Sequence, residues 1–503
     1  MSRVGKNILH NVLGQGALIV VSFVAAKVIH RQLGLDVLGL YFFSLVAGAV
    51  LTAALEFGLS STIVREVAAH ADDEPDYVRA LVRSAWTVYA GSVAVLGIVC
   101  WVLVPLAIGR WVDVEQLPRD EAVMVLRIFL ISAVLNLPRL LFTSVLQGLQ
   151  RFGTSNLIAL GASLVQQGGT LVVLTWSGSA VVLAGWYLTT AVVSIVIAAR
   201  ACTAALGIAI LVPGIRRDAV RRTRRFAGYA MLTSLLATVV TRIDRLILSS
   251  FLPIAALGSY GLGQTAVSKG QGMVNSISTA GYPALAKAYR AGSLMERYHK
   301  LDDLICILAV PLFAAIAIAE EPLFTYVFDS KISRSLQLPV LLLCVGSLMN
   351  ATISTSYASS LATGKPEIAA RLNMIAAVVI LPITIVLVST LGSAGAGASW
   401  IVYHLLAYAY ATPRFCRHCL DQMSPWVWYQ RVGKLLAVTG LAYGPVWAVL
   451  VWTDSTSLVA RGCVYALGTS LFLAGAYGFV ASEGFRTLIR TSLASIWSTV
   501  TCR

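Results

Sequence analysis

Two arginines and an aspartate lie in the middle of an apolar stretch of the sequence. Arg242, Asp244 and Arg245 fall within residues 228–251, which are otherwise rich in leucine, valine and isoleucine. A charged group at the centre of a membrane helix costs about 3 kcal/mol on insertion scales, so it usually faces a cavity or a partner. The two arginines share one helical arc with serines and threonines. The pattern predicts a cationic, wet cavity, because both arginines lie too deep to snorkel easily to a headgroup.

The other candidate intramembrane cations include Arg127 and Arg139 in an earlier apolar stretch, whereas the candidate acids are only Glu56 and Asp244. Since a carrier of organic cations should be lined by carboxylates, this balance predicts an anionic substrate. We therefore expect the anion to bind to Arg127, Arg139, Arg242 and Arg245. Glu56 and Asp244 are candidates for coupling to H⁺ or Na⁺, and an ion pair of Asp244 with a neighbouring arginine is an equal alternative.

Arg127 and Arg139 are expected to act at two depths. Twelve positions separate them, which corresponds to about 18 Å along one continuous helix. The two side chains could then pass an anion from one to the other.

Several apolar stretches also carry amide and tyrosine side chains on one helical face. Such stripes could line a polar cavity, because amides and phenols both donate and accept hydrogen bonds. The alternative is helix packing, since small and amide residues also hold membrane helices together. The predicted cavity-lining residues are Gln166, Gln167, Gln264, Gln271, Asn275 and Tyr260.

Composition places these residues in a polytopic membrane protein. Hydrophobic residues make up 58% of the 503 and charged residues 12%, and the mean hydropathy is +0.80; soluble domains are about one quarter charged. The net charge of +15 does not indicate a nucleic-acid partner, because lysine and arginine concentrate in every second loop, as the positive-inside rule requires. The first apolar stretch has no convincing cleavage site, so we expect a retained first helix.

The hydrophobic pattern predicts an all-α fold with about fourteen transmembrane helices and both termini in the cytoplasm. The expected spans are 10–31, 37–61, 84–108, 123–146, 156–176, 180–206, 228–251, 256–283, 303–320, 336–361, 372–391, 395–412, 434–453 and 459–481.

Internal similarity suggests two six-helix lobes related by a pseudo-two-fold axis along the membrane normal. Gly39-Leu40-Tyr41 has a counterpart in Gly258-Ser259-Tyr260, and Gly178-Ser179-Ala180 in Gly392-Ser393-Ala394. The expected organisation is an N-lobe (1–212), a basic cytoplasmic linker (213–227), a C-lobe (228–412), two added helices (413–482) and a cytoplasmic amphipathic tail (483–503).

No cofactor and no metal site are expected. Cys416-Arg417-His418-Cys419 has a metal-like spacing, but a structural zinc site needs about four ligands and the loop has no second pair. The acidic turn Asp72-Asp73-Glu74-Pro75-Asp76 is interpreted as a solvated cytoplasmic turn, and no nucleotide-binding fingerprint is present. A membrane glycosyltransferase or polymerase would expose a larger catalytic loop, so an enzyme is not expected.

The sequence resembles the Wzx-type polysaccharide-export flippases of the multidrug/oligosaccharidyl-lipid/polysaccharide exporter superfamily. The resemblance rests on Asn7-Ile8-Leu9, the turn from Leu33 to Tyr41, Phe57-Gly58-Leu59 followed by Arg65-Glu66-Val67-Ala68, the Leu146-Gln147-Gly148 turn and Gly395-Ala396-Gly397-Ala398. These motifs extend over nearly the whole chain, and they identify the family better than the substrate.

The resemblance implies a flippase that moves a polyprenyl-diphosphate-linked oligosaccharide from the inner to the outer leaflet by alternating access. The cargo would be a repeat unit of O-antigen, capsule or exopolysaccharide, and the membrane would be the inner (plasma) membrane of a bacterium. The arginines named above would line a cationic cavity, and the amide and tyrosine residues named above would bind the sugars. Membrane lipids are expected partners, and a polymerase and a chain-length regulator of the same pathway are candidates. The alternatives are a cation-coupled drug antiporter of the same superfamily and a lipid II flippase.

Overall fold

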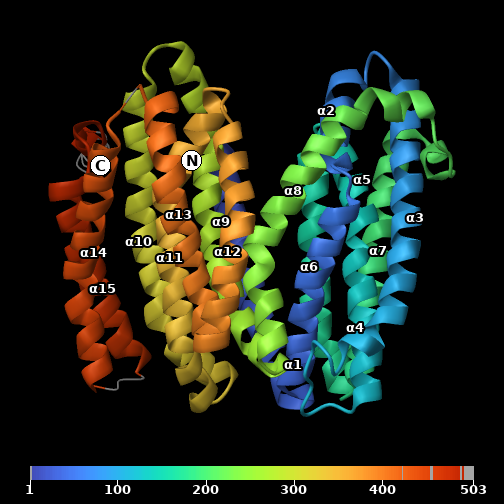
Figure 1. Cartoon of the computed structure of the whole chain (residues 1–503), viewed down its shortest axis with the longest axis horizontal. Helices are drawn as coiled ribbons and strands as arrows, with labels where there is room; N and C mark the ends of the chain where they lie inside the picture. Colours follow the sequence, from blue (N-terminus) through green and yellow to red (C-terminus); the bar gives the residue numbers. More distant parts are fainter. Residues whose placement is uncertain (1–2, 422, 454–456, 488–489, 492–503) are drawn as a thin grey trace, which may run out of the picture. The chain divides into compact units, whose positions relative to one another are not determined.

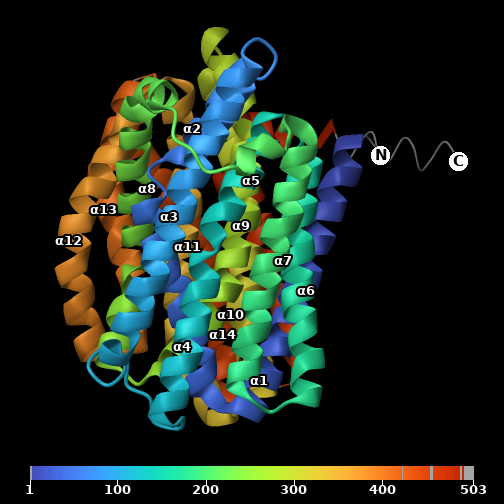
Figure 2. The same cartoon turned by 90° about the vertical axis from the view of Figure 1, so that its right-hand side faces the viewer.

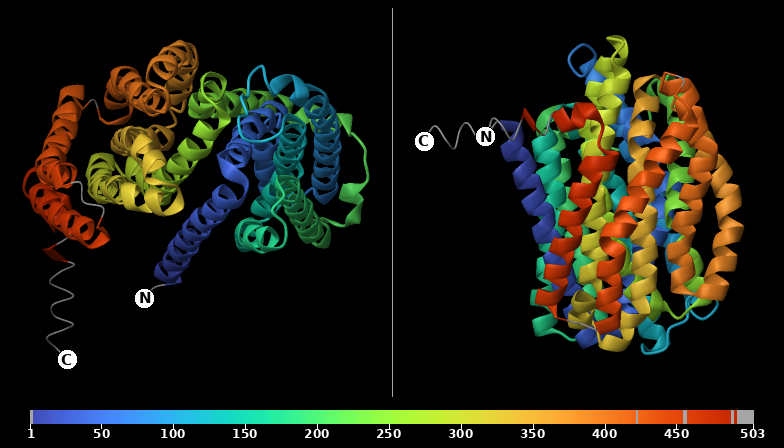
Figure 3. Two further views of the ribbon diagram at one scale, coloured as in Figure 1. Left: turned by 90° about the horizontal axis from the view of Figure 1, so that it is seen from below. Right: turned by 90° about the vertical axis from the view of Figure 1, so that its left-hand side faces the viewer.

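The expectation of an all-α protein is confirmed. The computed structural model describes residues 3–421, 423–453, 457–487 and 490–491, which form long helices joined by short turns and no β-sheet (Figure 1). By its internal contacts the chain divides into two compact units, Met1–Leu262 and Gly263–Arg503. Figure 2 shows the same cartoon turned so that helices of the N-terminal unit face the viewer, and Figure 3 adds a view from below and a view from the opposite side.

The N-terminal unit is a bundle in which α1, α4, α6 and α7 pack against one another and α2, α3 and α5 pack beside them. It also contains α8 and the first turns of α9. Its elements are α1 (Arg3–Leu55), α2 (Leu59–His70), α3 (Pro75–Ala107), α4 (Arg119–Val134), α5 (Asn136–Gly148), α6 (Phe152–Trp176), α7 (Ala180–Leu206), the 3-10 turn η1 (Ile208–Leu211), α8 (Arg217–Phe251) and α9 (Ile254–Arg290).

The C-terminal unit packs α10, α11, α12 and α13 into a second bundle, with α14 and α15 forming a hairpin that contacts α10. Figure 3 shows this hairpin, in red, at the edge of its unit. The elements that follow α9 are α10 (Leu294–Val327), α11 (Ser330–Ala362), α12 (Glu367–Leu391), α13 (Ser393–Cys419), α14 (Pro425–Thr453), α15 (Leu458–Gly475) and the π-helical turn η2 (Ala476–Val480).

Each of the fourteen predicted spans falls mainly on helix, and the bounds of α7 are those expected. Ten segments of the described chain are long and apolar enough to cross a membrane. The number is below fourteen because the two arms of α1 are continuous, and because the more polar helices α8, α9 and α13 are not among the ten. The count of fourteen crossings stays a prediction.

The first two expected spans form one kinked helix. α1 bends at Gly34, whose φ of 81° and ψ of 176° lie outside the helical region. A side chain would be strained at this φ, and a Cβ here would lie 2.8 Å from the side-chain oxygen of Gln116. The second arm ends at Leu55 and not at residue 61, since Phe57 and Gly58 both have positive φ and start a new helix, α2.

The fourth expected span is broken. α4 ends at Val134 and α5 begins at Asn136, because Pro138 lacks the backbone N–H that a continuous helix would use and its ring crowds the preceding turn. The interruption at Leu135 lies between Arg127 on α4 and Arg139 on α5, so the two residues are not on one continuous helix. Their expected difference in depth stays a prediction.

Two glycines that the internal repeat makes equivalent touch each other within the N-terminal unit. A Cβ at Gly258 of α9 would lie 2.9 Å from the backbone nitrogen of Gly39 in α1, and a Cβ at Gly39 would lie 2.1 Å from the carbonyl oxygen of Ile254. Only glycine allows the two backbones this approach. The two glycines thus allow α9 to pack closely on α1, and the internal repeat stays a prediction.

Each unit has its own apolar core. The core of the N-terminal unit contains Tyr89 and Phe142, and that of the C-terminal unit contains Tyr298, Phe415 and Cys416. Cys416 is a free thiol in this core, and the described residues contain no group of side chains that could hold a metal. Most of the expected amphipathic tail, 483–503, lies outside the described residues.

Candidate functional site

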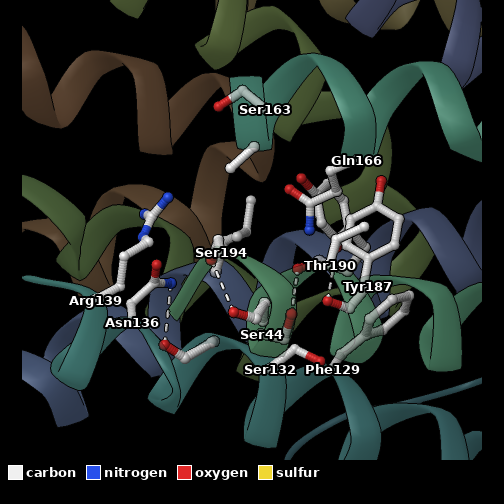
Figure 4. Close-up of a pocket in the computed structure, with 15 residues that line it drawn as sticks. Ser44, Phe129, Ser132, Asn136, Arg139, Ser163, Gln166, Tyr187, Thr190 and Ser194 are labelled. Atoms are coloured by element: carbon white, nitrogen blue, oxygen red, sulfur yellow. Dashed lines mark hydrogen bonds between the residues drawn. The ribbon is translucent and has the colours of Figure 1, made fainter. Parts of the chain in front are cut away.

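A polar cavity of about 180 Å³ lies inside the N-terminal unit, enclosed by α1, α4, α5, α6 and α7 (Figure 4). Five helices contribute to its wall, so no single stretch of sequence builds it. Its lining residues are Tyr41, Ser44, Leu45, Phe129, Ser132, Ala133, Asn136, Arg139, Ala162, Ser163, Gln166, Tyr187, Thr190, Ala191 and Ser194.

Arg139 is the one cation of this wall. The side chain is partly buried, and its guanidinium forms no hydrogen bond and no ion pair with any residue that the structure describes. In Figure 4, Arg139 and Asn136 lie on one side of the cavity and Gln166 and Tyr187 on the other. An uncompensated charge in a low-dielectric site is costly, so Arg139 is poised for an anionic ligand.

The hydroxyl groups of the wall are turned back onto their own helices. Ser44 donates to the Tyr41 carbonyl at 2.7 Å, Ser132 to Ile128 at 2.8 Å, Ser163 to Ala159 at 3.0 Å, Thr190 to Tyr187 at 2.9 Å and Ser194 to Ala191 at 2.7 Å. Asn136 likewise donates from Nδ2 to the Ala133 carbonyl at 3.1 Å. These side chains therefore present oxygen lone pairs to the cavity.

Three aromatic rings form one side of the wall. Tyr41, Phe129 and Tyr187 pack edge to face, with ring centroids 5.0–5.7 Å apart, which is the favoured geometry for aromatic pairs. Gln167 lies beside the Tyr41 hydroxyl, whereas Gln166 lines the cavity itself. Of the residues predicted to bind substrate, the cavity thus contains Arg139 and Gln166.

The contribution of α7 to the cavity was not expected from the sequence. Tyr187, Thr190 and Ser194 stand at positions i, i+3 and i+7 of this helix, and all three line the cavity. This spacing marks one face of a helix, so the signal was present. A single polar residue in each turn of an otherwise apolar span makes it weak.

Arg127 lies away from this cavity. Its Nε and Nη2 atoms donate to the carbonyl of Trp101 on α3 at 3.0 and 2.7 Å, and its guanidinium lies 4.3 Å from the centroid of the Trp101 ring. The structure therefore does not bring Arg127 and Arg139 together. A role for Arg127 in binding the anion stays a prediction.

The charged residues of α8 form a small network with α9. Asp244 is buried, accepts a hydrogen bond from the Tyr260 hydroxyl at 3.0 Å and lies 3.6 Å from Nε of Arg245. Of the two roles considered for Asp244, the structure thus shows the ion pair with a neighbouring arginine. The same carboxylate also binds the Tyr260 hydroxyl. Arg242 forms no hydrogen bond or ion pair among the described residues.

The amide stripe of α9 continues in the C-terminal unit, where part of it holds helices together. Gln271 donates from Nε2 to Asn275 at 3.1 Å and to Asn350 of α11 at 2.7 Å, and Asn350 contacts Nε2 of His404 on α13 at 3.0 Å. Gln264 is buried and its Oε1 has no partner. Helix packing thus accounts for the amide of Gln271, and sugar binding by this stripe stays a prediction.

Glu56 lies at the break between α1 and α2, not inside a helix. Its backbone carbonyl accepts the Tyr89 hydroxyl at 3.0 Å, while its carboxylate forms no hydrogen bond or ion pair in the described chain. The structure leaves it available for coupling to a cation, which stays a prediction.

The sequence analysis missed four buried acids. Asp302, Asp303, Glu320 and Glu321 are all buried in α10, which extends beyond both ends of the predicted span 303–320. The statement that Glu56 and Asp244 are the only candidate acids is therefore wrong. Arg431 binds the first two at 3.0 and 2.6 Å, and Arg461 pairs with Glu321.

The acidic turn from Asp72 to Asp76 contacts the basic segment of α8. Arg222 donates to both carboxylate oxygens of Glu74, at 2.9 and 3.3 Å, and its guanidinium lies 4.3 Å from the Tyr77 ring centroid. The hydrogen bond from Arg222 holds the pKa of Glu74 below its ordinary value. The turn is thus partly ion-paired, and the described residues show no metal-binding group there.

Comparison with known proteins places this bundle in a family. The profile of the polysaccharide biosynthesis protein family matches residues 4–289, which is more than half of the chain. The chain belongs to this family. No curated protein sequence matches it. The matched region of this polysaccharide biosynthesis protein includes all five helices that enclose the cavity.

Solved structures confirm the expected exporter-superfamily fold for this family member. It is similar to a lipid II flippase MurJ in an inward closed conformation, with a TM-score of 0.72 and 12% identity over 95% of this chain and 99% of that one. An inward-facing multidrug resistance MATE family transporter of the MOP superfamily has a TM-score of 0.59 and 17% identity, over 79% of this chain and 94% of that one. A MOP superfamily transporter from Pyrococcus furiosus, described as having a binding pocket of reverse polarity, has a TM-score of 0.51 and 15% identity, over 80% of this chain and 96% of that one.

Proposed function

We propose that this protein is a flippase that moves a polyprenyl-diphosphate-linked oligosaccharide from the inner to the outer leaflet of a bacterial plasma membrane. The single observation that carries the proposal is the polar cavity with its unpaired Arg139. A cavity of this kind binds anionic, hydroxyl-rich groups. Membership of a polysaccharide biosynthesis family favours a glycan as their source.

The two ends of such a lipid require different surroundings during transport. Its polyprenyl tail stays in the bilayer, while the diphosphate and the sugars cross through a polar interior. Guanidinium groups replace water around phosphate oxygens by charge-assisted, often bidentate, hydrogen bonds. Arg242 and Arg245, three positions apart on α8, supply two guanidinium groups for this role.

The membrane potential favours this direction of transport. Moving one elementary charge across about 100 mV is worth roughly 2.3 kcal/mol. Export of a diphosphate with two negative charges from a negative interior therefore gains up to about 4–5 kcal/mol, less whatever a co-transported cation changes. Glu56, with its unpaired carboxylate, is the better placed of the two coupling candidates, since Asp244 is already ion-paired.

Lipid II flipping is the second candidate, because the similarity to MurJ covers 95% of this chain, against about 80% for the multidrug transporters. Both flippase functions require an anionic headgroup to cross. The drug antiporter is less well supported, since three of the four buried acids of α10 are bound to arginine. In every case the proposed location is the plasma membrane with cytoplasmic termini. For the oligosaccharide flippase, a polymerase and a chain-length regulator of the same pathway are the proposed partners.

Deletion of the gene in its host tests the proposal. The deletion strain is expected to accumulate polyprenyl-diphosphate oligosaccharide confined to the inner leaflet, as measured by mass spectrometry of the lipids and by lectin access from either side. Accumulation of lipid II alone would support the second candidate. Unchanged lipid carriers together with new sensitivity to drugs or dyes would overturn both in favour of the antiporter.

A further inference from the structure

We propose that the cavity of the N-terminal unit binds one carboxylated sugar of the oligosaccharide, with Arg139 on its carboxylate. This inference rests on the proposed function and names the group that the cavity takes. It also separates the cavity from the diphosphate, which is left to the arginines of α8. Size, hydrogen-bonding capacity and charge support it in turn.

The size of the cavity fits a single ring. Its volume of about 180 Å³ lies below the roughly 300 Å³ at which pockets for drug-sized ligands begin. We therefore assign a single sugar ring to the cavity, with the rest of the glycan outside it.

The hydrogen-bonding capacity of the wall selects a ligand with many donors. Ser44, Ser132, Ser163, Thr190 and Ser194 all give their protons to helix carbonyls, so toward the cavity they accept. Sugar hydroxyls supply the matching donors. A diphosphate carries only acceptor oxygens, which would meet the lone pairs of these five side chains.

The charge of the wall selects a monoanion. Arg139 is its one cation, and none of the lining residues is acidic. A carboxylate matches a guanidinium in both charge and planar geometry, with two parallel hydrogen bonds. A neutral sugar would leave the charge of Arg139 uncompensated, and a diphosphate would bring two negative charges to one positive charge. The rings of Phe129 and Tyr187 offer the C–H face of the sugar an apolar surface.

Binding of free monosaccharides to the full-length protein in nanodiscs tests this assignment. Titrations followed by saturation-transfer difference NMR would use glucuronate, glucose and inorganic pyrophosphate as probes. The dissociation constant for glucuronate is expected to be about tenfold or more below that for glucose, which is the effect of a charge-assisted bond on a carboxylate. Glucuronate is also expected to bind without being displaced by pyrophosphate.

Two variants test whether Arg139 causes the preference for glucuronate over glucose. Arg139→Gln is expected to bind glucuronate no better than glucose, because the amide cannot supply the charge. Arg119→Gln removes the same charge at an exposed position at the start of α4 and is expected to keep the preference. The wild-type comparison needs neither variant, so the proposal stays testable if Arg139→Gln does not fold.

Equal affinity of the wild type for glucuronate and glucose would overturn the inference, as would a preference that survives in folded Arg139→Gln. Displacement of glucuronate by pyrophosphate at lower concentration would assign the cavity to the diphosphate instead. The proposed function is measured separately, by flipping of lipid-linked oligosaccharide in vesicles. Flipping without a glucuronate preference would remove only this inference, and a preference without flipping would remove only the proposed function.

Discussion

Two arginines of the C-terminal unit and two of the N-terminal unit are used in opposite ways. In the C-terminal unit, Arg431 binds Asp302 and Asp303, and Arg461 pairs with Glu321, so that α14 and α15 are each joined to α10. In the N-terminal unit, Arg139 and Arg242 are partly buried and contact no carboxylate of the described residues, although Arg245 beside Arg242 is paired with Asp244. The residue type is the same throughout. Pairing therefore separates an arginine that fastens helices from one that is available to a ligand.

The paired arginines should matter most for stability. Arg431→Ala leaves two buried carboxylates without their cation, and removal of one partner of a buried pair costs about 3–5 kcal/mol. We expect a loss of this size in the free energy of unfolding, measured by denaturant titration in detergent. Arg414→Ala is the control: Arg414 contacts only its own helix, at the Tyr410 carbonyl and ring, and should change stability by less than about 0.5 kcal/mol. If both variants lost the same free energy of unfolding, the ion pairs of Arg431 would not be what stabilises the C-terminal unit.

Charge reversal at two arginines of α8 should distinguish an arginine available to the ligand, Arg242, from one that is ion-paired, Arg245. Arg242→Glu is expected to lower flipping by about hundredfold or more, since a like charge facing the diphosphate costs several kcal/mol, and to leave the free energy of unfolding unchanged. Arg245→Glu should lower both, because it places a carboxylate beside buried Asp244. Vesicle flipping assays and unfolding curves on the same samples measure this. Full transport by both variants would contradict the cationic site.

Arg139→Gln sharpens the contrast by removing an unpaired charge. The loss of a charge-assisted hydrogen bond, at about 1.5–3 kcal/mol, should lower flipping of an acidic oligosaccharide by roughly ten- to hundredfold. The unfolding free energy should not fall, since no described partner is left behind. A variant that loses stability as Arg431→Ala does would show that Arg139 is structural.

The smallest expected effect tests a supporting residue. Tyr260→Phe removes the hydrogen bond that the Asp244 carboxylate accepts at 3.0 Å, while Arg245 remains. We expect a loss of about 1–2 kcal/mol in the free energy of unfolding. Tyr289→Phe, at an exposed position, is the control and should have no measurable effect. A Tyr260→Phe variant as stable as its control would show that the bond contributes nothing.

The contrast between the units explains what the sequence could predict. Helix positions follow from long apolar stretches, which is why α7 was placed at its observed bounds. The break between α4 and α5 was missed, although Pro138 signals it, because the apolar pattern continues across it. The acids of α10 were overlooked because they stand at the two ends of the apolar stretch: Asp303 and Glu320 are the terminal residues of the predicted span 303–320, and Asp302 and Glu321 lie just outside it.

Pairing is a long-range property, and periodicity carries no information about it. Arg431 and Asp303 are 128 positions apart, so their contact could not be anticipated from either neighbourhood. The same holds for the cavity, whose wall comes from five helices. Arg139 and Gln166 were nevertheless predicted from their polarity alone, because a polar side chain in an apolar helix usually has a polar partner or faces a cavity. Arg127 met the same criterion, but its guanidinium binds the carbonyl and the ring of Trp101 and does not line the cavity.

The most direct measurement of the central claim is flipping of purified polyprenyl-diphosphate oligosaccharide in vesicles that contain the wild type, Arg139→Gln or Arg414→Ala. The wild type and Arg414→Ala are expected to move an acidic lipid-linked oligosaccharide to the opposite leaflet, and folded Arg139→Gln is expected to move it roughly ten- to hundredfold more slowly. Equal flipping by all three, or none by the folded wild type, would contradict the account.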